Sequence, residues 1–178
     1  MISEKQMMLA NNWDYDDVNG WLATEKLWDA RCYWDGKDFW SRGSLKVAAP
    51  DWFKSGLPNV HLDGGVFCAG NEAEAIDAIS FGRFPLHAQF AVYDSPLAHS
   101  NYLERMADAA HWIRNCQHAF CVPVEKLSSR KQLAEKVQSV LARGGEGLML
   151  HSPKREYITG RTCEMLKLKW CPTEFLYC

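Results

Sequence analysis

Charged residues of the types that handle phosphate groups occur in four short clusters of this sequence. Lysine and arginine side chains bind phosphate oxygens, and an unprotonated lysine can act as a nucleophile. If residues 165–169 form a strand, Lys167 and Lys169 share one of its faces, because side chains alternate with a period of two. Taken singly, each cluster is typical of a solvated charge or a turn. The clusters are Glu25-Lys26 with Arg31, Ser41-Arg42-Gly43, Gly145-Glu146-Gly147 and Lys167-Leu168-Lys169.

The elements that would position these clusters are short strands, which alternate with helices in the second half of the sequence. Asn101 and Glu104 have the spacing of a capping box, which predicts that a helix begins there. Asp35-Gly36 is typical of a hairpin turn, since glycine tolerates a positive φ. We expect strands at 20–25, 30–34, 38–42, 59–67, 89–94, 148–150 and 165–169, and helices over 71–79, 101–115 and 129–143. This pattern predicts an α+β domain built on antiparallel sheets.

The composition is that of an ordinary globular protein. The chain has 178 residues, of which 47% are hydrophobic and 24% charged, which argues against a disordered tail, a collagen and a coiled coil. The formal net charge of −2 argues against a uniformly cationic nucleic-acid binder, but it leaves room for a local basic face. We expect one domain over residues 1–178.

The cysteines and the N-terminal sequence indicate a reducing compartment. The sequence has seven cysteines, an odd number, and their spacing does not repeat. This favours free thiols over a complete disulfide framework. The first ten residues carry charges where a signal peptide has an apolar stretch. No apolar run approaches the roughly 20 residues of a membrane helix. We therefore expect a soluble, cytoplasmic protein with no membrane partner, in the host cytoplasm or nucleoid if the source is a virus.

In this order, the clusters resemble those of the nucleotidyltransferase (adenylation) domain of ATP-dependent DNA ligases, in particular the minimal bacterial and viral ones. The resemblance runs from about Leu9 to Lys169. It includes Trp-Asp-Gly at 34–36, Ala-Pro-Asp-Trp-Phe at 49–53, Gly-Leu-Pro at 56–58, Leu-Asp-Gly at 62–64, Val-Tyr-Asp-Ser-Pro at 92–96, Gly-Gly-Glu-Gly-Leu-Met-Leu at 144–150 and Tyr157-Ile-Thr-Gly-Arg161. It implies an ATP-grasp-like fold in which two antiparallel β-sheets, flanked by helices, hold a nucleotide between them.

The resemblance also implies roles for the charged residues. It matches Lys26 to the lysine that attacks the α-phosphate of ATP and carries AMP, and Lys167 and Lys169 to lysines beside that phosphate. It matches Glu146 to a carboxylate linked to a divalent metal, Mg²⁺ or Mn²⁺. Tyr93 falls where an aromatic ring covers the adenine. The nucleotide-binding residues implied in this way are Glu25, Arg31, Arg42, Tyr93, Glu146, Lys167 and Lys169.

The sequence departs from two motifs of that family. The first motif, Lys-x-Asp-Gly, reads Lys26-Leu27-Trp28-Asp29, so that Trp28 replaces Asp and Asp29 replaces Gly if Arg31 keeps its register. An inserted tryptophan is the alternative alignment. In the third motif, Gly65 replaces a glutamate that binds ribose in the family. The chain also stops before the oligonucleotide-binding-fold domain that usually follows.

Two functions are compatible with these observations. One is a ligase-type adenylyltransferase that forms lysyl-AMP and passes AMP to the 5′-phosphate of nicked duplex DNA in repair, replication or recombination, with its activity impaired by the altered motifs. The other is a pseudoenzyme, an inactive pseudo-ligase that binds nucleotide, DNA ends or a protein partner. A separate protein could supply the missing domain. RNA ligation or capping is a weaker third hypothesis, because the matching segments are those of DNA ligases.

Two further groups of residues have competing interpretations. His111, Cys116, His118 and Cys121 offer four zinc-ligand types, but their spacing matches no usual zinc finger, so we interpret them as core residues. Trp28, Trp34 and Trp40 could stack on bases. We interpret Trp34 and Trp40 as core residues instead, whereas Trp28 adjoins the predicted nucleophile.

Overall fold

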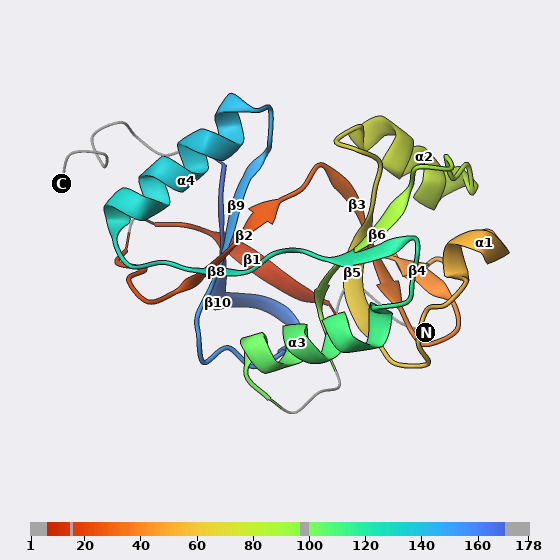
Figure 1. Cartoon of the computed structure of the whole chain (residues 1–178), viewed down its shortest axis with the longest axis horizontal. Coiled ribbons are helices and arrows are strands. Elements are labelled where there is room, and N and C mark those ends of the chain that lie inside the picture. The colour runs from red at the N-terminus through yellow and green to blue at the C-terminus, as the bar shows by residue number, and fades with distance from the viewer. Residues whose placement is uncertain (1–6, 15, 97–99, 170–178) are drawn as a thin grey trace.

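Two mixed β-sheets lie side by side in the computed structural model of this chain, which describes residues 7–14, 16–96 and 100–169. In Figure 1 the first sheet is on the left and the second on the right. The first sheet has the order β1 (Met8–Asn12), β10 (Gly160–Leu168), β9 (Gly147–His151), β2 (Leu22–Lys26) and β8 (Glu125–Lys126). The second has the order β4 (Phe39–Ser41), β3 (Asp29–Trp34), β5 (Leu62–Phe67), β6 (Gln89–Asp94) and β7 (Ala119–Cys121).

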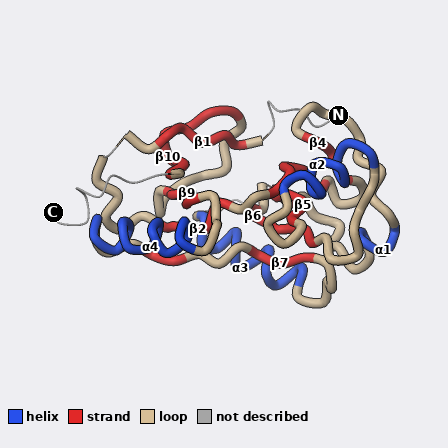
Figure 2. The backbone as a smooth tube through the Cα atoms, turned by 90° about the horizontal axis from the view of Figure 1, so that it is seen from above, coloured by secondary structure: helices blue, strands red, loops and turns tan. Residues whose placement is uncertain are grey.

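The helices flank these sheets. They are α1 (Asp51–Lys54), α2 (Glu72–Phe81), α3 (Tyr102–Ile113) and α4 (Arg130–Ala142). α4 packs on β9 of the first sheet, α2 on β3 and β5, and α3 on β6 and β7. Figure 2 shows β1 and β10 on one side of the molecule and α3 and α4 on the other. The predicted capping box forms, because Asn101 accepts from the backbone N–H of Glu104 while the Glu104 carboxylate accepts from that of Asn101.

The predicted α+β class is confirmed, as are the helices and the main strands. Most neighbouring strands are antiparallel, but each sheet also contains one parallel pair: β1 with β10, and β6 with β7. The predicted hairpin forms at Gly36, whose φ is 93°. Four short elements were not predicted, namely β1, α1, β7 and β8. The last three have only two to four residues and are too brief to show a hydrophobic period.

Each sheet has its own apolar core. Under the second sheet, the rings of Phe39 and Phe90 meet edge to face, with centroids 4.9 Å apart. Under the first sheet, α4 buries an apolar stripe against β9 and β10. Trp34 is buried as predicted, and its indole donates to the carbonyl of Pro58, whereas Trp40 is only partly buried. A third, smaller cluster of Leu22, Tyr102 and Met106 joins β2 to α3.

None of the helices in the described part of the chain is long and apolar enough to cross a membrane.

Candidate active site

A cavity of about 320 Å³ opens between the two sheets. Strands of both sheets line it, and so do seven of the residues that the sequence singled out: Glu25, Lys26, Arg31, Arg42, Tyr93, Lys167 and Lys169. The eighth, Glu146, is in direct contact with two of these lysines. The structure thus brings together clusters that lie far apart in the sequence.

Lys26 and Glu146 form the centre of this site. Lys26 ends β2 and is paired across the sheet with Gly147, which begins β9, so Glu146 is adjacent to it. The Nζ atom of Lys26 donates to Oε2 of Glu146 at 2.5 Å, and Nζ of Lys169 lies 2.5 Å from Oε1. Only 6% of the Glu146 side chain is exposed. A nearly buried carboxylate is therefore shared between two ammonium groups, which stabilises its charge.

A glycine next to Glu146 allows this close approach. Gly147 has a φ of 143°, and a Cβ atom there would lie 2.1 Å from the carbonyl oxygen of Leu168. No other residue fits without moving β10 away from β9. Gly147 therefore helps to hold Lys169, which directly follows β10, beside Glu146.

The two lysines of the last cluster lie where the alternation predicts. Lys167 is on β10 opposite Met149 of β9, and both Lys167 and Lys169 line the cavity. Three lysines therefore surround the same end of the cavity, close to Glu146. Such a concentration of positive charge is suited to a ligand with several phosphate oxygens.

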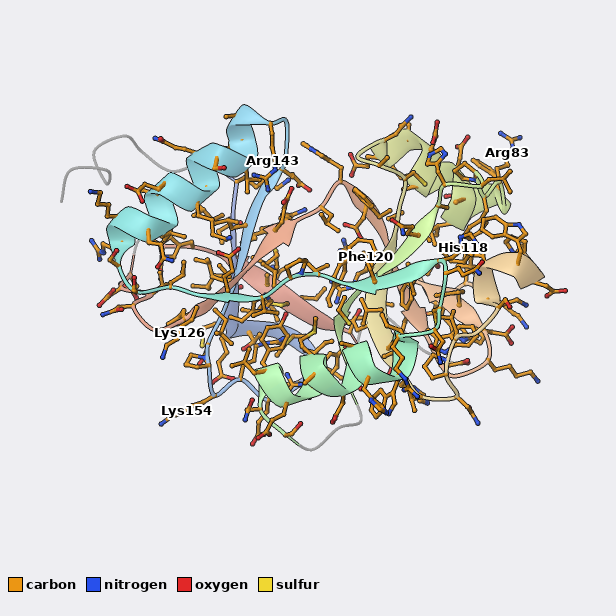
Figure 3. All side chains as sticks on the ribbon, viewed as in Figure 1. Arg83, His118, Phe120, Lys126, Arg143 and Lys154 are labelled. Atoms are coloured by element: carbon orange, nitrogen blue, oxygen red, sulfur yellow. The ribbon has the colours of Figure 1, made fainter. Side chains whose placement is uncertain are left out.

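Glu25 of β2 and Arg42, which follows β4, line the cavity from different sheets. The Glu25 carboxylate is paired with Arg143, which follows α4 (Figure 3). Arg42 lines the cavity and is exposed. Both residues therefore line the cavity, although Glu25 is already bound to a cation of this chain.

At the other end of the cavity, Arg31 is held by Asp63 of β5. Its Nε and Nη2 atoms donate to the two carboxylate oxygens of Asp63 at 2.8 and 2.6 Å. The hydroxyl of Tyr157 donates to the same carboxylate at 2.7 Å. Asp63 is only 1% exposed, and this bidentate pair fixes the guanidinium beside the ring of Tyr93, 5.4 Å from its centroid.

Asp29 also lies in the cavity, two residues before Arg31 on β3. The hydroxyl of Tyr93 donates to its Oδ2 atom. Burial raises the pKa of Asp29 from 3.8 to about 6, while the Tyr93 hydrogen bond and the charges of Arg31 and Lys26 act in the opposite direction. Burial and the neighbouring Asp29 raise the pKa of Tyr93 well above 10. Tyr93 therefore stays protonated and remains a hydrogen-bond donor to Asp29.

A buried ion-pair network, in which Asp94 and Arg155 also line the cavity, joins the two sheets. Asp94 of β6 accepts from Nε of Arg105 on α3 and from Nη2 of Arg155 in the β9–β10 loop, both at 2.6 Å. All three side chains are at most 3% exposed. Because its two arginines come from different sheet systems, the Asp94 carboxylate fixes the distance between the sheets.

Residue His151 of β9 completes this region. Its ring stacks on Tyr102 with centroids 4.3 Å apart, and its Nε2 atom is 3.1 Å from the hydroxyl of Thr24. Burial, and then the charges of Arg155 and Arg105, hold its pKa well below 6.5. The imidazole is therefore neutral at pH 7.

Trp28 does not enter the cavity. Its indole N–H donates to the carbonyl of Gly144 at 2.9 Å, and so links the β2–β3 connection to the α4–β9 loop. The cavity is lined instead by Leu27 and Asp29, the neighbours of Trp28 on either side. The tryptophan in the altered first motif therefore takes none of the ligand space.

The prediction that the four residues with zinc-ligand side chains belong to the core is correct only in part, because Cys116 and Cys121 pack against the core of the second sheet and His118 is partly buried. His111 is exposed, so its interpretation as a core residue is wrong: it lies on the outer face of α3. Among the described residues, three possible metal ligands converge only at Cys68, Glu74 and His87, away from the cavity. There, His87 and Glu74 are paired at 2.9 Å, and burial raises the pKa of the Cys68 thiol to about 11.

Sequence reasoning missed several cavity residues. Asp63 and Tyr157 stand in segments that carry the family resemblance, but neither was assigned a role. Asp94 also stands in such a segment, at 92–96. Arg155 has no local signal, because a buried ion pair depends on contacts between elements far apart in the sequence. Asp29 was noticed only as a departure from a motif.

Comparisons with known proteins agree with this geometry. No family model matches the chain. A DNA ligase of Haemophilus influenzae is 29% identical over 175 residues, which cover 94% of this chain and 64% of that protein. The chain thus spans less than two thirds of the length of this curated relative. A structure of Lig E DNA ligases, described as binding DNA with a minimal scaffold, matches with a TM-score of 0.84 and 27% identity over 92% of this chain and 68% of that one.

A more distant structure shows the same fold. The Chlorella virus DNA ligase-adenylate matches with a TM-score of 0.77 and 21% identity, over 93% of this chain and 67% of that one. The arrangement of two sheets described above is therefore the fold of these structures.

Proposed function

We propose that this chain, which has the fold and much of the sequence signature of the nucleotidyltransferase domain of ATP-dependent DNA ligases, is an adenylyltransferase that forms lysyl-AMP on Lys26. The observation that carries the proposal is the contact of Lys26 with Glu146 at the lysine-rich end of the cavity. A nucleophile, a proton acceptor and additional positive charges lie together there, which is the combination that this reaction uses.

In the proposed reaction, the Nζ lone pair of Lys26 attacks the α-phosphorus of ATP. A phosphorus–nitrogen bond forms, the bond from the α-phosphorus to the bridging oxygen breaks, and pyrophosphate leaves with that electron pair. Glu146 is placed to accept a proton from Nζ, because the two groups already share a hydrogen bond. Lys167 and Lys169 neutralise the charge on the phosphate oxygens.

A divalent cation, Mg²⁺ or Mn²⁺, fits this site only together with the nucleotide. Both oxygens of Glu146 are in contact with ammonium groups at 2.5 Å. Mg²⁺ in such sites is held by one or two carboxylates and by substrate phosphates. Glu146 and the phosphates of ATP would hold the ion, which supplies further charge neutralisation at the triphosphate.

We further propose that AMP is passed to the 5′-phosphate of a nick in duplex DNA. The support is the resemblance to DNA ligases over 94% of the chain and the position of Arg42 at the exposed edge of the cavity. Because the chain spans 64% of the length of its curated relative, sealing of the nick is proposed together with a further domain or a separate partner. Such a reaction belongs in the cytoplasm, where ATP and DNA are available.

The test is the intact mass of the purified protein after incubation with ATP and Mg²⁺, and in parallel with Mn²⁺. We expect a gain of one AMP in the wild type and none in Lys26→Ala. The matched control is Lys126→Ala, which removes an exposed lysine from β8 of the same sheet (Figure 3), and it should form the adduct normally.

Absence of the adduct from the folded wild type with both metals would overturn the proposal. The chain would then be a pseudo-ligase, and its affinity for nicked duplex DNA as a function of salt would be the next measurement. A positive result leads instead to a nick-sealing assay with the adenylated protein.

A further inference from the structure

We propose that the carboxylate of Asp29 takes the place of the side chain absent at Gly65 and binds the ribose hydroxyls of the nucleotide. This inference rests on the proposed function, because it assigns the sugar subsite of the same cavity. It makes Asp29 a residue that determines specificity for ribonucleotides. It also explains together two positions, 29 and 65, at which the sequence departs from a family motif.

The two positions share one space. Gly65 of β5 is paired with Arg31 of β3, and Asp29 lies two residues away on the same face of β3. A Cβ atom built on Gly65 would lie 1.7 Å from Oδ2 of Asp29 and 2.6 Å from the hydroxyl oxygen of Tyr93. A side chain at position 65 and a carboxylate at position 29 therefore exclude each other. The cavity keeps one carboxylate here, supplied by β3 rather than by β5.

The position of Asp29 indicates which part of a nucleotide it meets. Its Oδ2 atom accepts from the hydroxyl of Tyr93, whose ring forms with the guanidinium of Arg31 a surface suited to a flat base. Asp29 is also close enough to Lys26 and Glu146 for the charges of both to act on it. In a nucleotide, the sugar lies between the base and the phosphates. A ligand with its phosphates at the lysines and its base at Tyr93 therefore presents its sugar to Asp29.

The chemistry of the carboxylate agrees with that position. Ribose offers two neighbouring hydroxyl donors, and an ionised carboxylate has about four acceptor sites. Tyr93 donates to Oδ2 of Asp29 and so fixes the carboxylate while leaving acceptor capacity for a ligand. If the hydrogen bond between Asp29 and Tyr93 were purely structural, the affinity for a nucleotide would not depend on its sugar hydroxyls. The two cases therefore differ in a measurable affinity.

The experiment compares the dissociation constants of ATP, 2′-deoxy-ATP and 3′-deoxy-ATP by isothermal titration calorimetry with the full chain. A hydrogen bond to a charged acceptor is worth enough for us to expect roughly 10-fold weaker binding of at least one deoxy analogue to the wild type. Asp29→Asn, which keeps the shape of the side chain, should lose most of this discrimination.

Variants at positions 29 and 65 test whether the carboxylate of Asp29 replaces a side chain at position 65. Gly65→Glu alone should lose ATP affinity, because two carboxylates compete for one space, and Asp29→Gly alone should lose sugar discrimination. The double variant Asp29→Gly/Gly65→Glu should regain both. Near-ultraviolet circular dichroism on each variant separates a binding effect from a failure to fold.

The outcomes separate this inference from the proposed function. Sugar discrimination that depends on Asp29, without an AMP adduct on Lys26, would leave the ribose subsite intact and overturn the adenylation. An adduct with equal affinity for ATP and both deoxy analogues, or unchanged discrimination in Asp29→Asn, would overturn the inference alone. A wild type that binds none of the three nucleotides would overturn both.

Discussion

The Nζ atom of Lys26 lies 2.5 Å from Oε2 of Glu146, although the two residues are 120 positions apart in the chain. Their contact depends on the register of β2 against β9, which pairs Lys26 with Gly147. A shift of one residue would turn every side chain of β2 to the opposite face of the sheet. The site therefore depends on strand pairing as much as on the identity of the two residues.

Replacing Glu146 should slow the formation of lysyl-AMP. In Glu146→Gln, the amide keeps the size of the side chain but cannot accept the proton of Lys26 as a carboxylate does. We expect the single-turnover rate of lysyl-AMP formation to fall by about 10²-fold or more, while the protein remains folded. Glu135→Gln, on the exposed face of α4, is the control. An unchanged rate in Glu146→Gln would contradict the role of Glu146.

Breaking the buried network at Asp94 should destabilise the whole protein. Arg155→Met removes one partner and leaves the Asp94 charge less well compensated, which costs about 3–5 kcal/mol for a buried pair. Urea unfolding monitored by tryptophan fluorescence measures this change.

The control for this experiment is an exposed ion pair. Arg83 and Asp77 are 3.8 Å apart on the surface (Figure 3), and Arg83→Ala should change the free energy of unfolding by about 1 kcal/mol or less. Equal effects of Arg155→Met and Arg83→Ala would show that the buried network does not hold the sheets together.

The raised pKa of Asp29 predicts how the stability depends on pH. Because its pKa is about 6 in the folded state and 3.8 as a free group, the folded protein binds this proton more tightly. The tighter proton binding adds to the free energy of unfolding. This stabilising contribution is fully present below pH 3.8 and is lost as the pH rises through about 6. The groups that face Asp29 are Tyr93, Arg31, Lys26 and Glu146.

Asp29→Asn removes this titration. The free energy of unfolding of the wild type, relative to that of Asp29→Asn, should therefore decrease between about pH 4 and pH 6.5. Urea titrations of both proteins across this range measure the difference, in which the other carboxyl groups largely cancel. A difference that rises with pH would mean that the Asp29 pKa is lowered instead.

Trp28 should be dispensable for the chemistry. Trp28→Phe removes the hydrogen bond to the Gly144 carbonyl and should cost about 1 kcal/mol of stability. The adduct on Lys26 should still form, because the indole lies outside the cavity lining. A drop of more than 10-fold in the adenylation rate, with stability unchanged, would place Trp28 in the reaction.

Local sequence signals were sufficient to single out the residues at the lysine-rich end of the cavity. Lys26, Glu146, Lys167 and Lys169 each stand in a short run that resembles a family motif, and strand alternation places the last two on one face. The opposite end could not be predicted in this way. The pairing of Arg31 with Asp63 depends on the register between β3 and β5.

The relation between Asp29 and Gly65 could not be predicted from the sequence either, because it also depends on how two strands pair. Each position departs from a motif, and two independent departures predict a weakened pocket. In the folded chain they are diagonal neighbours on adjacent strands, and one side chain fills the space of the other. The prediction that His111 is a core residue was wrong for a simpler reason. The helix that carries it was predicted, but the face of this helix that is buried was not.

The two sheets differ in how the chain builds them. The second sheet uses one continuous segment, residues 29–121, whereas the first joins β1 and β2 to β8, β9 and β10 from the other end of the described chain. Closing a long loop costs entropy before any contact stabilises it. During synthesis on the ribosome, the second sheet can therefore assemble early, while the first waits until β10 has emerged. The cavity needs both sheets, so it cannot form on a nascent chain until synthesis of this region is nearly finished.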